Sequence, residues 1–176
     1  MTLYDYFEQG GVIMYILLIM SIFGMTIMVW KALAIAATAR RKTELFALFY
    51  ARSGGEEMGD TVLLERCLNE EIREHLLRLE AGLNIVRVIA SVSPLLGLLG
   101  TVIGILLAFD VISESGMNDP ALFADGISMA LVTTVGGLIV SIPHYVGYSC
   151  LTTAIDRLEA AWNRGTVQLL KERAGQ

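Results

Sequence analysis

The sequence predicts an all-α integral membrane protein with three transmembrane helices and long cytoplasmic helical extensions. Three observations lead to this fold class. Of the 176 residues, 55% are hydrophobic and 18% are charged, with a mean hydropathy of +0.60, whereas soluble domains have about 25% charged residues. Three long stretches contain no Asp, Glu, Lys or Arg. Every Lys and Arg lies in 31–87 or 157–173, between or after those stretches.

The uncharged stretches predict the spans. A helix rises about 1.5 Å per residue, so about 20 apolar residues cross the roughly 30 Å hydrocarbon core. The first span is 11–30 and the second is 88–109. The third stretch is bracketed by Asp125 and Asp156, and we place its span at 123–150. None of the stretches alternates polar with apolar residues, so strands of a β-barrel are not expected.

The distribution of charge predicts the orientation. Short loops rich in Lys and Arg stay in the cytoplasm, and residues 1–10 and 110–125 contain acidic residues and no basic ones. We therefore expect a single membrane domain over 1–176, with its N-terminus outside and its C-terminus in the cytoplasm. Its expected parts beyond the bilayer are an outer segment 1–10, cytoplasmic helices in 31–87, an outer turn 110–122 and a cytoplasmic tail 151–176.

The cytoplasmic parts are predicted to be amphipathic helices. Residues 31–52 continue the first span as a helix, and the glycine-rich stretch 53–59 interrupts it. Residues 61–87 form the next helix, with apolar residues at helical spacing: Leu64, Leu68, Ile72, Leu76 and Leu79. We interpret the charges on this helix as a solvated face that permits ion pairs one turn apart.

Composition excludes several functions. The net charge is −5 and the 13 basic residues form no strip that could neutralise phosphates, so we expect no nucleic-acid partner. Two cysteines and two histidines provide neither a metal cluster nor a catalytic triplet. The chain is therefore expected not to be an enzyme, to have no catalytic or metal-binding residue, and to need no cofactor.

Small and hydroxyl side chains form one stripe on each of the last two spans. Glycines at such spacing let helices approach closely, as in the Gly100–Gly104 pair. The hydroxyls can bond to their own helix, and they also suit a hydrated or proton-permeable seam. The stripe of the second span is Ser93, Gly97, Gly100, Thr101, Gly104 and Ala108, and that of the third is Gly126, Ala130, Thr133, Thr134, Gly137 and Ser141.

The middle of every span lacks a carboxylate, although proton routes through membranes normally contain an Asp, Glu or His. His144 lies near the expected inner surface beside Tyr145 and Tyr148, either as an interfacial histidine or, with Tyr148, as a cytoplasmic exit. If the chain conducts protons, another chain should supply the carboxylate. Pro94 and Pro143 can bend their helices or act as a gate, because proline removes a backbone hydrogen bond.

Two motifs resemble the ExbB/TolQ/MotA proton-channel family. They are SPLLGLLGTVIGI at 93–105 and GISMALVTTVGGL at 126–138, the latter followed by Ile142-Pro143. The segment GGVIM at 10–14 also resembles short ExbB-type members. The order of the motifs matches the expected topology.

The resemblance implies a location, a function and partners. The membrane is expected to be the bacterial inner membrane, so the outer side, with the N-terminus, is the periplasm. Family members assemble as homo-oligomers, expected to be pentamers, around single-span partners of ExbD, TolR or MotB type whose membrane Asp carries the proton. It implies a channel or stator subunit of a complex driven by the proton-motive force, which powers TonB-dependent outer-membrane transport or similar work. A TonB-like protein is then a further candidate partner, and the lipid bilayer surrounds the assembly.

By motif position, the resemblance assigns Thr101 and Thr134 to the polar wall of the ion pathway. We add Thr133, Ser141 and Met129 to that wall as residues of the same stripe and motif. Pro94, Gly97, Gly100, Gly104, Gly137 and Pro143 are expected to serve helix packing and bending.

Met129 is a departure from the family pattern, since the ExbB and TolQ branch usually has Glu at this position. Two alternatives therefore stay open: a non-conducting membrane scaffold of the same fold, and a MotA-like motility stator. The sequence does not distinguish protons from sodium ions.

Overall fold

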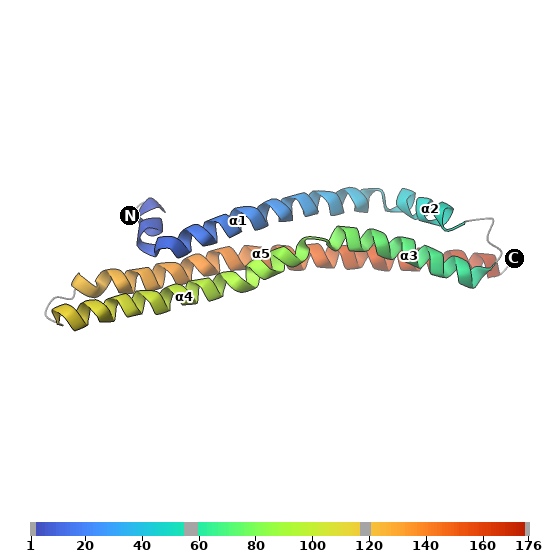
Figure 1. Ribbon diagram of the computed structural model, residues 1–176. Helices are drawn as coiled ribbons and strands as arrows, with labels where there is room; N and C mark the ends of the chain where they lie inside the picture. The colour runs from blue at the N-terminus through green and yellow to red at the C-terminus, as the bar shows by residue number, and fades with distance from the viewer. Residues whose placement is uncertain (1–2, 55–59, 117–120, 175–176) are drawn as a thin grey trace. The chain divides into compact units, whose positions relative to one another are not determined.

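The structure is a computed structural model that describes residues 3–54, 60–116 and 121–174. Its elements are α1 (Leu3–Arg40), α2 (Lys42–Arg52), α3 (Thr61–Glu80), α4 (Leu83–Ser115) and α5 (Ala121–Ala174) (Figure 1). Across the described ranges there is no β-strand. Three helices, α1, α4 and α5, are long and apolar enough to cross a membrane by length and composition. The all-α prediction with three membrane-crossing helices is therefore confirmed.

The helices break at places that the sequence pattern did not show. The helix predicted to run from the first span to residue 52 is divided at Arg41, and α2 begins at Lys42. The helix predicted over 61–87 is divided at Ala81–Gly82, because Gly82 takes a φ of 89° that belongs to the left-handed region. Gly11 (φ 59°, ψ −152°) also interrupts α1. Residues 55–59 of the predicted interruption lie outside the described residues.

The chain divides into two compact units. The first unit contains Met1–Met28 and Ile85–Tyr148, and thus the first part of α1, most of α4 and the first half of α5. In Figure 1, α4 and α5 of this unit run side by side in opposite directions. A core of Ile13, Leu17, Ile89 and Val140 joins all three helices.

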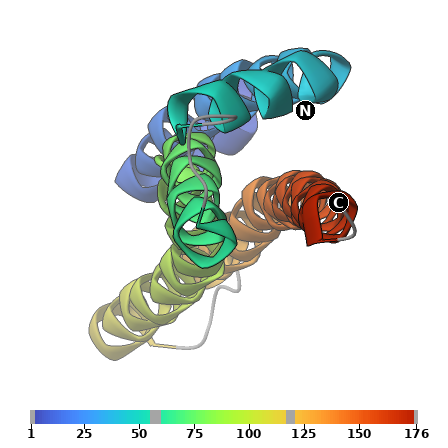
Figure 2. The same ribbon diagram turned by 90° about the vertical axis from the view of Figure 1, so that its right-hand side faces the viewer.

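The second unit contains Val29–Asn84 and Ser149–Gln176. Figure 2 looks towards the ends of its helices. The five apolar residues predicted at helical spacing on α3 are all buried, which confirms that pattern. Phe49 of α2, His75 of α3 and Trp162 of α5 form three mutual ring contacts, with centroids 5.3–5.7 Å apart.

Three polar contacts fix the ends of helices in the second unit. The Asp60 carboxylate accepts hydrogen bonds from the backbone N–H groups of Val62 and Leu63, which caps the start of α3. Buried Lys31 donates from Nζ to the carbonyl oxygen of Arg78 at 3.0 Å, in the last turn of α3. A cation at this place also complements the partial negative charge of a helix C-terminus.

Candidate functional site

The seam between α4 and α5 brings the two small-residue stripes face to face. A Cβ atom at Gly97 would lie 2.8 Å from the carbonyl oxygen of Thr133, and one at Gly137 would lie 2.6 Å from that of Ser93. Gly104 approaches the backbone of Gly126 and Ala130 in the same way. The backbones therefore touch, as small residues allow in membrane helices. Gly97, Gly100, Gly104 and Gly137 all lie in this seam.

Thr101 and Thr134 lie on the same edge of the seam. Each follows a residue of the packed stripe, Gly100 or Thr133, and the next residue of an α-helix is turned by about 100°. Because α4 and α5 are antiparallel, a rotation of about 100° in each helix leads to the same edge of the seam. Both threonines therefore lie on that edge. Both side chains are half-buried. Ser141, seven residues after Thr134, lies on that edge as well.

Helix α1 covers the opposite edge of the seam. Met14 and Leu17 of α1 approach Gly136, which lies on the opposite side of α5 from Thr134. The edge with the three hydroxyls is therefore left uncovered by α1. Its flanks carry the exposed apolar side chains of Leu98, Ile105 and Leu138. We call this surface, made of Thr101, Thr134, Ser141 and the three flanking residues, the hydroxyl edge.

The hydroxyl groups of this edge donate to backbone carbonyls. Thr101 Oγ1 donates to the carbonyl of Leu98 at 2.6 Å, and Thr134 Oγ1 lies 3.4 Å from that of Gly97 on the facing helix. A hydroxyl has one proton and two lone pairs. With the proton engaged, each oxygen can still accept a hydrogen bond from a group outside the chain.

Ser141 has a further role next to Pro94. Proline has no N–H, so the carbonyl four residues earlier, that of Ala90, loses its normal helical donor. Ser141 Oγ donates to this carbonyl at 2.6 Å across the seam. The α4 helix continues through Pro94, and α5 continues through Pro143.

Other residues predicted to line the pathway lie elsewhere. Thr133 is fully buried in the seam, where its hydroxyl donates to the carbonyls of Met129 and Ala130 on its own helix. The Met129 side chain points towards α1, with Cε 3.5 Å from where a Cβ of Gly11 would be. Thr133 and Met129 therefore do not share the hydroxyl edge.

His144 is fully buried against a glycine that the sequence analysis did not single out. A Cβ at Gly24 of α1 would lie 2.5 Å from Nε2 of His144, so only glycine leaves room for the ring. Nδ1 donates to the carbonyl of Val140 at 2.7 Å, because a carbonyl oxygen can only accept. Nε2 has no hydrogen-bond partner in the described part of the chain. Tyr148, its expected companion at an exit, is half-buried.

The sequence analysis also did not predict a cavity in the first unit, next to the end of α4 and the start of α5. Glu8 and Gln9 of α1 line it together with Asp125 and Met129 of α5 and residues of α4. Ser128 Oγ donates to Gln9 Oε1 at 3.1 Å, which ties the start of α1 to α5. The acidic residues were visible in the sequence as parts of two separate segments, but only the fold brings them together.

Comparisons with known proteins agree with the motifs. The profile of the MotA/TolQ/ExbB proton channel family matches residues 42–164. The biopolymer transport protein ExbB of Aquifex aeolicus is 35% identical over 121 residues, which cover 68% of this chain and 82% of that protein.

Two longer relatives match over shorter parts. The biopolymer transport protein exbB1 of Vibrio cholerae is 35% identical over 102 residues, covering 57% of this chain and 45% of that one. The Tol-Pal system protein TolQ of Haemophilus influenzae is 34% identical over 94 residues, covering 53% and 41%. The chain thus spans less than half the length of these two relatives. Since the family consists of channel proteins, the prediction that the chain is not an enzyme is confirmed. With its matched profile and its three apolar helices, the chain is a multi-pass membrane protein that belongs to the MotA/TolQ/ExbB proton channel family.

Proposed function

We propose that this chain is the wall-forming subunit of an energy-transducing complex driven by the proton-motive force in the bacterial inner membrane. Several copies, five by family resemblance, surround a single-span partner of ExbD, TolR or MotB type. The hydroxyl edge of each copy faces that partner helix. The work powered is TonB-dependent outer-membrane transport or a similar task, with a TonB-like protein as the receiving chain.

The observation that carries the proposal is an uncovered, apolar edge with three hydroxyls and no carboxylate. An apolar surface with a few hydroxyls suits contact with one apolar helix in a bilayer. A proton route needs a titratable group at membrane depth, and the middle of neither span that forms this edge contains an Asp or Glu. The partner's membrane Asp would supply that group.

The hydrogen bonds of the edge support a role in proton passage. Thr101 and Thr134 use their protons inside the chain, so their free lone pairs face the partner. They can accept from a protonated carboxyl group or from a water molecule beside it. The wall thus stabilises the neutral, protonated form of the partner's Asp while that group moves along it.

The orientation in this proposal rests on charge. All basic residues except Arg87 belong to the second unit, and cytoplasmic segments near membrane spans are rich in Lys and Arg. The second unit would then lie in the cytoplasm, together with the C-terminus. The cavity with Glu8 and Asp125 would lie on the periplasmic side.

The test is pH-gradient-driven proton flux into proteoliposomes. The chain is reconstituted alone, with its single-span partner, and with that partner's membrane Asp changed to Asn. Flux is expected only with the intact partner. Flux from the chain alone would contradict the proposal that the partner chain supplies the carboxylate. A bound, intact partner without flux would instead favour a non-conducting scaffold, the alternative that Met129 suggests.

The hydroxyl edge is tested in the same assay. The double change Thr101→Val and Thr134→Val keeps the side-chain shape but removes both hydroxyls, and should lower flux about tenfold. Thr26→Val is the matched control, since Thr26 is exposed on α1 and its hydroxyl donates to its own helix at Ile22. Equal flux in the double variant and in this control would refute the role of the edge.

A further inference from the structure

Half of the residues that line one groove in the second unit are alanines. The groove lies between the inner part of α1 and the tail of α5. Two exposed basic residues, Lys42 and Arg157, stand at it, and neither forms an ion pair within the described residues. Small side chains let a further helix approach closely, and the basic residues favour one that carries carboxylates. The lining includes Ala32, Ile35, Ala36, Ala39, Lys42, Leu151, Ala154, Arg157, Leu158 and Ala161.

The outer face of α3 has the matching chemistry. Glu70, Glu74 and Leu77 recur at spacings of four and three, so they share one face. That face is opposite the buried row of Leu64, Leu68, Ile72, Leu76 and Leu79. Both glutamates are exposed, and Leu77 is 56% exposed although it is a large apolar residue. Glu74 makes only an exposed ion pair with Arg78 at 3.4 Å, which contributes little.

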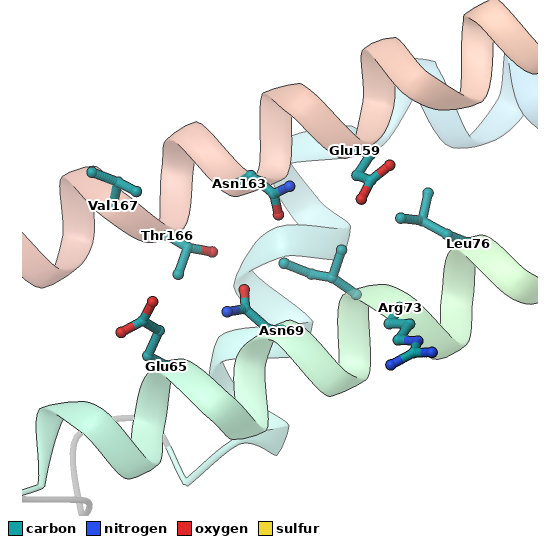
Figure 3. Close-up of a pocket in the computed structure, with 9 residues that line it drawn as sticks. Glu65, Asn69, Arg73, Leu76, Glu159, Asn163, Thr166 and Val167 are labelled. Atoms are coloured by element: carbon teal, nitrogen blue, oxygen red, sulfur yellow. The ribbon is translucent and has the colours of Figure 1, made fainter.

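The heights of the two surfaces along the helix axes also match. Figure 3 shows Asn69 of α3 opposite Asn163 of α5, and Glu65 opposite Thr166, in helices that run in opposite directions. Both helices have the same rise per residue, so positions can be counted from these opposite pairs. By this count Glu70 lies at the height of Trp162, and Glu74 lies close to the height of Arg157. The Nε1 atom of Trp162 donates to the carbonyl of Lys42, so Lys42 shares the height of Glu70.

The same count places Leu77 one turn beyond Glu74, at the height of the alanines of the groove. A second copy of the chain crosses the same bilayer with the same three helices, so copies related by rotation about the membrane normal stand at equal heights. The outer face of α3 in one copy and the alanine-lined groove of the next copy therefore lie at the same height. Because they are different surfaces, their contact is head-to-tail, and such a contact forms a ring where the rotation from one copy to the next closes.

We infer that the outer face of α3 in one copy docks into the alanine-lined groove between α1 and α5 of the next copy. Glu70 then pairs with Lys42, Glu74 pairs with Arg157, and Leu77 packs on Ala36 and Ala154. The inference rests on the homo-oligomer of the proposed function and names the surfaces that join its copies.

Cysteine cross-linking tests the contact directly. Two differently tagged copies, both with Cys67→Ala and Cys150→Ala, are co-expressed with the partner chain; one carries Leu77→Cys and the other Ala36→Cys. Mild oxidation should give dimers that contain both tags. The control pair replaces Ala36→Cys by Ala47→Cys, an exposed α2 position more than two turns away in height.

Several outcomes would overturn the contact. Equal cross-linking in the control pair would do so, as would no mixed dimer from a sample that is oligomeric by analytical ultracentrifugation. Attachment of the Ala36→Cys copy to the single-span partner instead of a second copy would also overturn it. These results leave the flux assay unaffected, whereas failed flux with mixed dimers present would refute the proposed function and keep this interface.

Charge reversal tests the ion pairs. Lys42→Glu with Arg157→Glu should weaken self-association about tenfold, since two surface pairs become repulsive. Adding Glu70→Lys and Glu74→Lys should restore it. Arg40→Glu, an exposed change on α1 outside the groove, is the matched control and should have no effect. Failure of the fourfold variant to recover association, while it remains folded by circular dichroism, would contradict the pairing.

Discussion

The two units of the molecule hold their helices together by different means. In the first unit, Gly97, Gly104 and Gly137 bring the backbones of α4 and α5 into contact, and large apolar side chains such as Ile19 and Leu95 point outward. In the second unit, Leu64, Leu68 and Trp162 are almost fully buried. The proposed location of the first unit in the bilayer and of the second unit in water accounts for this difference. Lipid tails are as apolar as a leucine, so burying one gains little in a bilayer, and close packing must stabilise the pair. In water the burial itself is favourable.

Charged groups follow the same division. Hydroxyls donate to backbone carbonyls in both units, as Ser93 and Ser141 do in the first and Thr166 does in the second. The exposed ion pairs, such as Arg41 with Glu44, lie in the second unit. A polar group in hydrocarbon needs a partner within the protein, whereas a charge on a water-exposed face does not. The two kinds of packing predict mutational effects of different size.

The largest effect should come from Trp162→Ala in the second unit. Trp162 is 2% exposed, contacts Phe49 and His75, and donates to the carbonyl of Lys42. Its removal should lower the local free energy of unfolding by about 4 kcal/mol. Hydrogen exchange of α3 measures this, with the exposed Val167→Ala as control. Equal protection in both variants would show that the ring cluster does not hold the second unit together.

The next effect should come from Gly104→Ala in the first unit. A Cβ there meets the backbone of Gly126 and Ala130, which cannot move without separating the helices. We expect a loss of about 2 kcal/mol from overpacking. In Gly136→Ala the new atom meets the flexible end of Met14 and is at ordinary contact distance from Leu17, so this control should lose much less. Reversible unfolding in detergent measures both, and equal losses would contradict the contact between backbones.

A smaller effect is expected for Ser141→Ala. It removes the donor to the Ala90 carbonyl, which Pro94 has already deprived of its helical N–H. The cost should be about 1 kcal/mol. Ser91→Ala is the control, because Ser91 only adds a second donor to a carbonyl, that of Arg87, in a regular stretch of helix. The same unfolding assay should separate the two variants.

The smallest effect is a dependence of the second unit on pH. Burial between the rings of Phe49 and Trp162, followed by the positive charge of Arg78, lowers the pKa of His75 below its usual 6.5. The unfolded unit then binds more protons in the window just below pH 6.5, so stability rises with pH there. It should be fully present above about pH 7 and decrease on acidification.

Hydrogen exchange at several pH values measures this dependence after correction for the intrinsic exchange rate. His75→Phe keeps the ring contacts and should flatten the profile between pH 5 and 7 (about the range in which histidine titrates). A variant with an unchanged slope would show that another group titrates in this window.

Local patterns were sufficient for the buried face of α3. Five apolar residues at helical spacing predicted a helix with one buried side, and all five are buried. The break at Ala81–Gly82 was not predictable in the same way. The charged and apolar pattern continues through it, and only the positive φ of Gly82 shows that α3 and α4 are separate. The turn at Arg41 likewise follows a run of helix-forming residues.

The candidate site shows a similar limit. Spacing placed Thr101, Thr133 and Thr134 on stripes, but a stripe about 100° wide has a centre and two edges. The structure puts Thr133 in the centre and the other two on one edge. Met129 shares the motif of Thr133 and Thr134, yet it faces α1. Which edge α1 covers depends on contacts between residues more than a hundred positions apart.

The sequence by itself determined the all-helical membrane class, the family and the absence of a carboxylate from the middle of the spans, because these depend on composition, length and local motifs. Only the tertiary structure decided which hydroxyls share an uncovered edge, where His144 finds room beside Gly24, and which surfaces of the second unit stand at equal height. These features depend on the register between helices. Register is determined by close contacts of backbone and side chains from distant parts of the chain, and no local pattern contains it.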